Sequence, residues 1–475
     1  MEALAEIAVV GLGTMGRNFA LNLAQNLAPR GQAVAVYNRS PQKTQALMAG
    51  EGGGLGLRPA YSPAELAGML RQPRALILVV EAGAAVDALL AEFAPLLAPG
   101  DVVCDGGNSH YRDTQRRAAD LAGAGLRYLG LGISGGAAGA RNGPSLMPGG
   151  APEAYARLRP ALEATAARVE GVPCVAYLGA GAAGHYVKMV HNGIEYALMQ
   201  LIAEAYDLLT RGLGQGPDQA GQAFAAWSQG PLASYLVEIT AAICATPDPE
   251  TGRPILGLIR DRASQKGTGQ WASLEALGLG EPTPCIDQAV GLRHLSALET
   301  ARAGLAGRLG GPRRIGAAVP EFLPRLEGAL LAGFVIAFSQ GMALLGRADR
   351  AYGFGLDLAT VVRIWRGGCI IRAGLLGPIM AAYRARPDLA NLLLDPHLGG
   401  LVAARAADLR TAVCAAAGAG LPAPGLMSAL AYLDALACGA LPTNLIQAQR
   451  DFFGAHTLER SDRPGRVHFP WPGGG

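Results

Sequence analysis

Three glycines near the start of the chain constrain its fold more than any other feature. Gly11, Gly13 and Gly16 follow the apolar run 6–10 and open a stretch with helical spacing. At a strand-to-helix junction, glycines at this spacing allow a tight turn, a close approach to a pyrophosphate and close packing of helix on strand. The alternative is a purely structural turn. We predict a dinucleotide-binding loop made of Gly11, Leu12, Gly13, Thr14, Met15 and Gly16.

Short apolar runs alternate with helical patterns over the first 180 residues. This alternation is typical of a parallel β-sheet covered by helices. We therefore predict an α/β Rossmann-type N-terminal domain at residues 1–180. The runs predicted as strands are 6–10, 33–37, 75–80, 101–104, 127–132 and 174–178.

After residue 184 the spacing becomes helical, with few strand-like runs. We predict a large all-α domain at residues 181–441, with long helical stretches at 187–213, 320–345 and 401–440. The remaining residues, 442–475, end in RPGRVHFPWPGGG, whose prolines and glycines disfavour regular structure. We expect a C-terminal tail with little structure of its own, which lies on another surface.

Residues 328–346 form a stretch of 19 residues without a charge, nominally long enough to span a membrane. The stretch contains Ser339 and Gln340, and it stands alone in a chain that is 50% hydrophobic. We interpret it as a buried core helix and expect no membrane association.

The overall charge and the cysteines exclude several classes of protein. A net charge of +3 with scattered basic residues does not indicate nucleic-acid binding. The seven cysteines form no CxxC pair and no metal-ligand spacing, so we expect neither a disulfide framework nor a metal site. No export signal is recognisable at the N-terminus. A cytoplasmic protein is the expectation.

The residues after the second predicted strand indicate which dinucleotide binds. An acidic residue there would hold the ribose 2′-hydroxyl of NAD, but the chain has Asn38, Arg39 and Ser40. Arg39 can pair with a 2′-phosphate through charge-assisted hydrogen bonds, and the other two can add donors. We therefore predict NADP as the cofactor. The alternative is a solvated arginine in a turn.

The segment KMVHNGIEY, residues 188–196, places five polar side chains in an otherwise apolar stretch. At about 100° per residue, five positions fall within an arc of about 140° on one helix face. They are Lys188, His191, Asn192, Glu195 and Tyr196. A solvated face would repeat Lys and Glu, so we interpret this face as one that lies under a cleft and contacts a bound molecule. Asn108 and residues 134–136 follow predicted strands, where open α/β sheets bind ligands.

Eight segments together resemble the 6-phosphogluconate dehydrogenase family, the decarboxylating enzymes of the pentose phosphate pathway. They are residues 11–16, DGGNS, GISGG, GARNGPSLMPGG, GHYVKMVHNGIEY, QKGTGQW, IWRGGCIIR and NLIQAQRDFFGAHT. The matches run from near the first residue to about residue 457. The resemblance implies NADP-dependent oxidative decarboxylation of 6-phospho-D-gluconate to D-ribulose 5-phosphate and CO2.

The resemblance also implies a role for each site residue. Lys188 is expected to be the general base and Glu195 the general acid. The residues expected to hold the sugar acid are Asn108, Ser134, Gly135, Gly136, His191 and Asn192. Those expected around its phosphate are Tyr196, Lys266, Arg293, Arg450 and His456, the last two from the other subunit of a homodimer with a shared active site. Val80, Glu81, Ala82 and Asn108 are expected beside the cofactor.

The chemistry is consistent with these residue types. Burial lowers the pKa of an amine, so Lys188 can take the proton of the substrate hydroxyl and then, as an ammonium, stabilise an enolate without a metal. A buried Glu195 has a raised pKa and can protonate the enediol.

Several positions depart from the pattern of the family. Glu81 stands where a lysine is usual, and its charge is expected to weaken cofactor binding or alter NADP preference. Other departures are His110, Ala137, Asn142, Gln270 and Phe452. Two alternatives remain open: another β-hydroxyacid dehydrogenase, and a catalytically silent cofactor-binding protein of the same fold.

Overall fold

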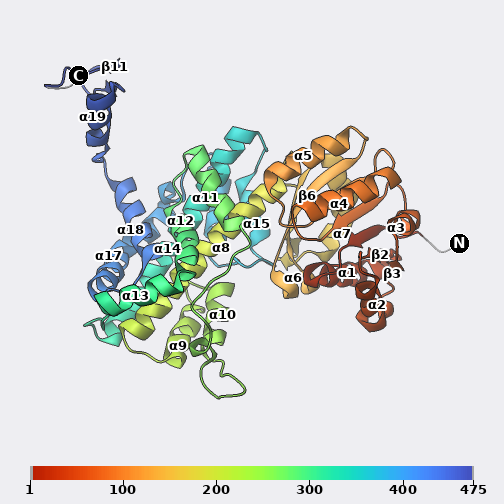
Figure 1. Cartoon of the computed structure of the whole chain (residues 1–475), viewed down its shortest axis with the longest axis horizontal. Helices are drawn as coiled ribbons and strands as arrows, with labels where there is room; N and C mark the ends of the chain where they lie inside the picture. Colours follow the sequence, from red (N-terminus) through yellow and green to blue (C-terminus); the bar gives the residue numbers. More distant parts are fainter. Residues whose placement is uncertain (1–3, 473–475) are drawn as a thin grey trace. The chain divides into compact units, whose positions relative to one another are not determined.

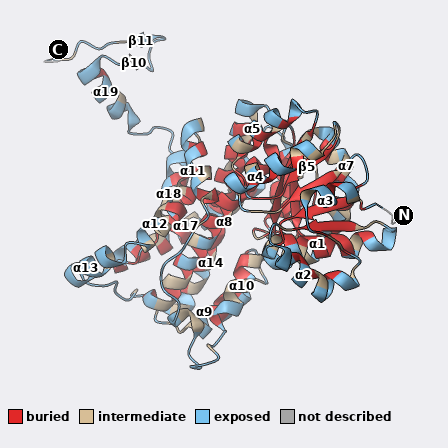
Figure 2. Cartoon of the chain, turned by 45° about the vertical axis from the view of Figure 1, so that its right-hand side comes forward, coloured by how far each residue is buried: buried red, intermediate tan, exposed pale blue. Residues whose placement is uncertain are grey.

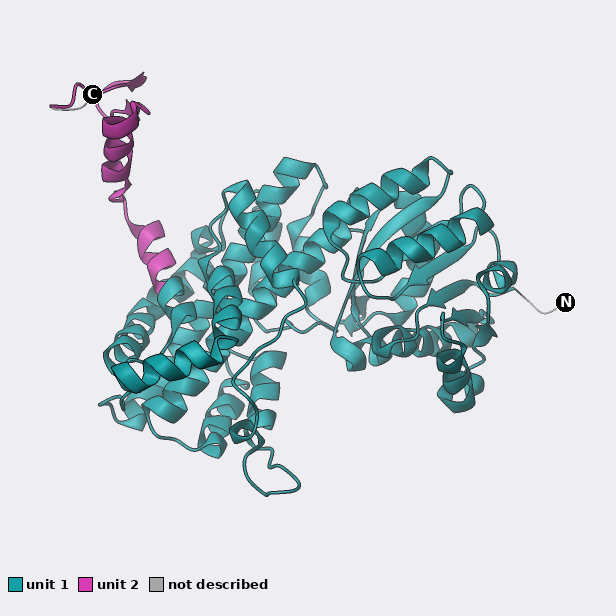
Figure 3. Cartoon of the chain, viewed as in Figure 1, with its two compact units in different colours: residues 1–429 teal, residues 430–475 magenta. Residues whose placement is uncertain are grey.

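The computed structural model describes residues 4–472 of the chain. Its contacts define two compact units, Met1–Ala429 and Leu430–Gly475 (Figure 3). The two units meet between Ala429 and Leu430, which is neither of the domain limits predicted at residues 180 and 441. Those limits stay predictions.

A seven-stranded sheet forms the N-terminal part of the first unit (Figure 1). Its strand order is β3-β2-β1-β4-β5-β6-β7, and all neighbouring strands are parallel except β6 and β7. The strands are β1 Ile7–Val10, β2 Val34–Tyr37, β3 Arg58–Ala60, β4 Ala75–Leu78, β5 Val102–Asp105, β6 Arg127–Ser134 and β7 Ser145–Gly150. The order reverses between β1 and β4, so a ligand crevice is expected at the carboxyl ends of these two strands.

Helices cover both faces of this sheet (Figure 1). One buried cluster joins the sheet to α1 and α7, and another joins it to α3, α4 and α5. Side chains alternate along β1, since Ile7 and Val9 belong to the first cluster and Ala8 and Val10 to the second. The helices of this part are α1 Thr14–Leu27, α2 Pro41–Leu47, α3 Pro63–Met69, α4 Ala84–Phe93, α5 Tyr111–Ala122, α6 Gly136–Asn142 and α7 Pro152–Thr165.

The rest of the first unit is helical, as predicted. A short antiparallel pair, β8 Arg168–Val169 and β9 Val172–Pro173, precedes it. The helices are α8 Ala183–Asp207, α9 Pro217–Trp227, α10 Tyr235–Cys244, α11 Thr268–Leu279, α12 Pro284–Ser296, α13 Glu299–Leu309, α14 Val319–Tyr352, α15 Leu358–Trp365, α16 Leu376–Ala385 and α17 Pro396–Ala419. Helix α18, Pro424–Ala437, begins in the first unit and ends in the second.

The long helix α14 forms the core of this helical part (Figure 2). By length and composition it would pass as a membrane span, yet 100% of its most apolar window is buried. It packs closely on α8, because a Cβ on Gly341 would lie 2.3 Å from Cγ1 of Ile194. The interpretation of residues 328–346 as a buried core helix is confirmed.

The first turn of α8 lies against the β6–β7 hairpin with almost no space between the backbones. A Cβ on Gly184 would lie 2.4 Å from the carbonyl oxygens of Gly130 and Met147. A Cβ on Gly149 would lie 2.2 Å from the amide nitrogen of Gly184. Because these neighbours are backbone atoms, glycine is required on both sides of the contact.

The strand predictions hold for five of six runs, with small differences at the ends. The prediction of a strand at 174–178 is wrong, because only Val175 forms a bridge, to Leu146 of β7. The partner strand contains Pro148, which has no N–H to continue the ladder. Strands β3 and β7 were missed, since proline and glycine mask their apolar pattern.

The predictions for the stretch 401–440 and for the tail also need correction. The stretch 401–440 is interrupted between the end of α17 at Ala419 and the start of α18 at Pro424, and Gly420 between them has a left-handed backbone. Within the predicted tail, α19 occupies Thr443–Gly454, followed by the antiparallel pair β10 Leu458–Glu459 and β11 Arg466–Val467. The tail therefore has more regular structure than expected, although residues 473–475 lie outside the described part.

The contact between α8 and the hairpin gives a stability prediction. Gly149→Ala should lower stability by about 1–3 kcal/mol, since the added methyl group meets backbone atoms that cannot move away. Gly400→Ala is the matched control, because this glycine lies inside α17 with nothing within 4 Å of its Cβ position. The control should be neutral or stabilising by about 0.5–1 kcal/mol. Thermal unfolding of both variants tests this, and a Gly149→Ala midpoint equal to that of the unaltered chain contradicts it.

Candidate active site

The three glycines of the predicted cofactor loop differ in what surrounds them. Gly11 has φ 97°, and a Cβ on Gly16 would lie 1.9 Å from the carbonyl oxygen of Gly11. A Cβ on Gly13 would meet nothing within 4 Å. No side chain caps α1, so the N–H groups of its first turn are available to an anion. The loop thus needs Gly11 and Gly16 for its own folding and leaves open space at Gly13.

Asn38, at the end of β2, holds this loop in place. Its Oδ1 accepts a hydrogen bond from the Leu12 N–H at 2.9 Å, and its Nδ2 donates to the Ser40 carbonyl at 3.2 Å. Arg39 and Ser40 are exposed beside it. Asn38 is therefore largely engaged in the turn, whereas Arg39 and Ser40 can contact a ligand.

Lysine is rare in this chain, and sequence reasoning did not use this in the search for site residues. Of the 40 lysine and arginine residues, three are lysines: Lys43, Lys188 and Lys266. Lys43 lies in the first turn of α2, and its N–H donates to the Ser40 carbonyl. It adds an exposed cation one turn after Arg39 and Ser40.

A buried arginine joins the loops that follow β4 and β5. Arg117 of α5 is 1% exposed, and its Nη2 donates to the Gly83 carbonyl at 2.9 Å. Its Nη1 donates to the Ser109 hydroxyl at 3.2 Å. These loops carry four predicted cofactor residues, of which Glu81 and Asn108 are exposed and Val80 and Ala82 are half-buried. Sequence reasoning missed Arg117, because an arginine inside an amphipathic helix looks like a solvated residue.

His185 joins the loop after β5 to α8. Its Nε2 donates to the carbonyl of Asp105 at 3.0 Å, so Nδ1 accepts from the Thr114 hydroxyl at 2.6 Å. Burial lowers the pKa of His185, which keeps the ring neutral. The residue lies one turn before Lys188 on α8, and sequence reasoning missed its positioning role.

Lys188 and Glu195 are brought together in one buried environment. Lys188 is 6% exposed, and its stem passes over Gly132, where a Cβ would lie 2.6 Å from the Lys188 Cβ. Burial lowers the pKa of Lys188, although the charge of Glu195 opposes this. Burial likewise raises the pKa of Glu195, whose side chain is 20% exposed, against the charges of Lys188 and Arg293. The two pKa values therefore move toward each other.

His191 and Asn192 form a hydrogen-bonded chain beside this pair. Asn192 Nδ2 donates to the Thr268 hydroxyl at 3.0 Å, so its Oδ1 faces His191 Nδ1 at 3.2 Å and accepts from it. His191 Nε2 then accepts from the Ser134 hydroxyl at 3.2 Å. Burial and the charge of Lys188 hold the pKa of His191 well below its usual value. Thr268, which sequence reasoning missed, fixes the amide of Asn192.

Tyr196, on the next turn of α8, packs against Arg293 of α12. The guanidinium carbon of Arg293 lies 3.6 Å from the ring centroid of Tyr196. Arg293 Nη1 donates to the Ser264 carbonyl at 3.0 Å, and exposed Lys266 follows two residues later. Tyr196, Arg293 and the loop of Lys266 are thus brought together, which places three predicted phosphate ligands in one region.

The predicted residues after β6 meet the segment IWRGGCIIR. A Cβ on Gly135 would lie 2.4 Å from the carbonyl oxygen of Gly368, whereas Gly136 faces open space. Cys369 is fully buried, its thiol is close enough to interact with the charge of Lys188, and burial raises the pKa of Cys369 to about 12. This segment therefore closes one side of the Lys188 environment.

Arg450 and His456 belong to the second unit and are exposed there. Arg450 Nη1 donates to the Gln447 side chain at 3.1 Å. Their predicted role in a partner's site stays a prediction.

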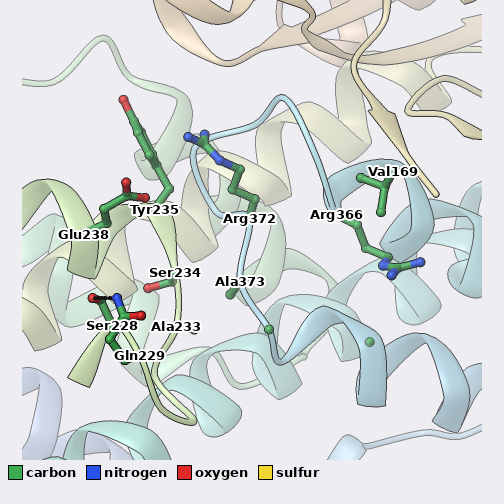
Figure 4. A pocket seen from close by; sticks show the side chains of 12 residues that line it. Val169, Ser228, Gln229, Ala233, Ser234, Tyr235, Glu238, Arg366, Arg372 and Ala373 are labelled. Carbon is green, nitrogen blue, oxygen red and sulfur yellow. Dashed lines mark hydrogen bonds between the residues drawn. The ribbon is translucent and has the colours of Figure 1, made fainter. Parts of the chain in front are cut away.

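Two arginines of the segment IWRGGCIIR, together with the residues that follow it, line a cavity of about 560 Å³ (Figure 4). The guanidinium carbon of Arg372 lies 3.6 Å from the ring centroid of Tyr235, and Glu238 and Arg366 also line the cavity. The lining residues are Val169, Ser228, Gln229, Ala233, Ser234, Tyr235, Glu238, Arg366, Arg372, Ala373, Gly374 and Gly377. None of them is a predicted site residue.

Within residues 4–472, no group of three or more His, Cys, Asp or Glu side chains has the arrangement of a metal site.

Two family models together match most of the chain. Residues 6–179 match the NAD binding domain of 6-phosphogluconate dehydrogenase, and residues 184–471 match the C-terminal domain of the same enzyme. The chain belongs to the 6-phosphogluconate dehydrogenase family. The resemblance seen in the sequence is therefore confirmed.

Curated relatives match along the whole chain. A decarboxylating 6-phosphogluconate dehydrogenase of Synechococcus elongatus is 46% identical over 99% of this chain and 100% of its own length. An NADP(+)-dependent one of Bacillus subtilis is 45% identical over 98% of this chain and 99% of its own. A solved structure of Plasmodium falciparum 6-phosphogluconate dehydrogenase, 37% identical, superposes with a TM-score of 0.94 over 98% of this chain and 100% of that one. The predicted fold class, an α/β Rossmann-type domain followed by a large helical domain, is confirmed.

Proposed function

We propose that this chain is an NADP-dependent oxidoreductase that converts 6-phospho-D-gluconate to D-ribulose 5-phosphate and CO2 in the pentose phosphate pathway. The observation that carries this proposal is the pair of buried Lys188 and half-buried Glu195 on α8, within a chain that matches the relatives from end to end. The two curated relatives are named as decarboxylating 6-phosphogluconate dehydrogenases, and the one of Bacillus subtilis is named as NADP(+)-dependent.

Lys188 is proposed as the general base of the oxidation. Its lowered pKa means that more of the amine is neutral at working pH, ready to accept the proton of the C3 hydroxyl. NADP, when bound, supplies the hydride acceptor. The open space at Gly13, the free first-turn N–H groups of α1, and Arg39 with Ser40 suit its phosphates.

After oxidation, the Lys188 ammonium stabilises the charge that develops on the C3 oxygen while CO2 leaves. His191 is neutral and donates through Nδ1 to Asn192, so it adds no competing charge beside the ammonium. Glu195, neutral because of its raised pKa, then protonates C1 of the enediol. Oxidation and protonation are thus assigned to two groups on one helix.

We further propose a homodimer in which Arg450 and His456 complete the phosphate site of the other copy, next to Arg293 and Lys266. The second unit exposes large apolar side chains, which supports burial against another surface. They include Leu445, Ile446, Phe452, Phe453 and Phe469, each between 36% and 73% exposed. We also propose a cytoplasmic location, with neither nucleic acid nor membrane as a partner.

The first test mixes the purified protein with 6-phospho-D-gluconate and NADP and follows reduced cofactor and D-ribulose 5-phosphate. Lys188→Arg keeps the positive charge but removes the ability to lose a proton. It should lower kcat by at least about 10²–10⁴-fold with cofactor affinity preserved. At Lys266, where only a positive charge is required, the same change to arginine should lower kcat far less. Turnover of unphosphorylated hydroxyacids alone, or of no substrate at all, contradicts the proposal.

The second test is the pH dependence of kcat/KM. The active form carries one proton on the pair, with Lys188 neutral and Glu195 protonated, so activity should fall when the pair gains or loses a proton. The acid limb should lie above 4.5 and the basic limb below 10.5, following the direction of the two pKa shifts. In Glu195→Gln only Lys188 titrates, so activity should rise with pH and the basic limb should disappear. A basic limb that survives this change is incompatible with the assignment.

The third test concerns the cofactor. Arg39→Ala should lower kcat/KM for NADP by about 10- to 100-fold, the value of one charge-assisted hydrogen bond, and leave the value for NAD nearly unchanged. Arg30→Ala removes another exposed arginine of the same domain and serves as the control. Equal losses with NADP and NAD would show that Arg39 does not read the 2′-phosphate.

A further inference from the structure

Asp451 is a buried carboxylate in a second unit whose other described side chains are mostly exposed. Its Oδ1 accepts from the Thr457 N–H at 2.9 Å and from His468 Nδ1 at 3.0 Å. Its Oδ2 accepts from the Phe469 N–H and from Trp471 Nε1, both at 2.9 Å. One carboxylate therefore joins the end of α19 to the last described segment of the chain.

This network fixes an unusual backbone around His456. The residues on either side of it, Ala455 and Thr457, have φ of 46° and 60°, a region that side-chain-bearing residues rarely adopt. Asp451 holds the Thr457 N–H, and Gln447 Nε2 donates to the Thr457 carbonyl at 2.5 Å. Because both backbone groups of Thr457 are held, the direction of His456 is set by α19.

Gln447 extends the same network to Arg450. Its Oε1 accepts from Arg450 Nη1, while its Nε2 binds the carbonyl of the residue next to His456. Asp451 follows Arg450 in the sequence, but its carboxylate is occupied by four other donors. Within residues 4–472 no ion pair involves Arg450, so its charge is available to an anion.

We propose that Gln447 and Asp451 are positioning residues that hold Arg450 and His456 as one preformed phosphate-binding unit. This inference rests on the proposed function, in which the pair binds the phosphate of a sugar acid in the other copy. Preorganisation removes the ordering cost that two free side chains on an exposed tail would otherwise have on binding. The loss of the network should therefore weaken substrate binding more than it slows the chemical steps.

The test uses Gln447→Met in the full-length protein, which keeps the size and helix propensity of the side chain but removes both hydrogen bonds. It should raise KM for 6-phospho-D-gluconate about tenfold while kcat changes less than threefold. Gln449→Met is the matched control, an exposed glutamine on the same helix, and should leave both constants unchanged. Asp451→Asn should act in the same direction, and sedimentation checks that each variant keeps the assembly state of the unaltered protein.

A double-mutant cycle separates positioning from general damage. When Arg450 and His456 are both replaced by alanine, Gln447→Met should have no further effect on KM. An unchanged KM in Gln447→Met alone, or an equal additional loss in the alanine background, overturns the inference. If the variant with alanine at both Arg450 and His456 has an unchanged KM, the assignment of the phosphate site is contradicted, and so is this inference. A raised KM in the alanine pair without an effect of Gln447→Met overturns only the positioning role.

Discussion

The close contact between the start of α8 and the β6–β7 hairpin determines the geometry of the candidate site. Glycines on both sides, Gly184 on the helix and Gly149 on the strand, let two backbones approach to a separation that no side chain permits. The helix is then held by His185, whose ring nitrogen donates to the Asp105 carbonyl at the end of β5. One turn later Lys188 passes over Gly132 of β6. The amine of Lys188, the proposed general base, is therefore placed by backbone packing at the edge of the sheet where the cofactor is expected, rather than by a flexible loop.

Burial also shifts the pKa values of Lys188 and Glu195, the two groups proposed to transfer protons. Attraction between an ammonium and a carboxylate favours the charged pair, whereas removal from water disfavours both charges. Burial is the larger effect for Lys188 and for Glu195, so the neutral pair becomes more accessible. Arginine cannot replace lysine in this role, because its guanidinium does not lose its proton in proteins. In a chain with three lysines among 40 basic residues, a lysine at this position is consistent with that requirement.

Local sequence signals predicted most of the fold. The glycine loop, the alternation of strands and helices, and the polar face of α8 each depend on short-range patterns that survive in the structure. Strands β3 and β7 were not predicted, because Pro59, Pro148 and adjacent glycines interrupt the apolar pattern of a strand. The strands with which they pair lie elsewhere along the chain. Lys188, Glu195 and other side chains whose chemistry suggests a role of their own were predicted as site residues, and those roles stay predictions. Arg117, His185 and Thr268 were not predicted. Their roles arise from hydrogen bonds between segments distant in sequence, which no local pattern encodes.

The central claim is that burial lowers the pKa of Lys188 against the opposing charge of Glu195. The small number of lysines allows a direct measurement, since ¹³C labelling of lysine side chains gives an NMR spectrum with three residues to assign. The signal missing from Lys188→Arg identifies the amine, and its chemical shift is followed against pH. This signal should titrate below 10.5, and at a still lower pH in Glu195→Gln, where the carboxylate that raises the pKa is absent. Titration at or above 10.5 would contradict it.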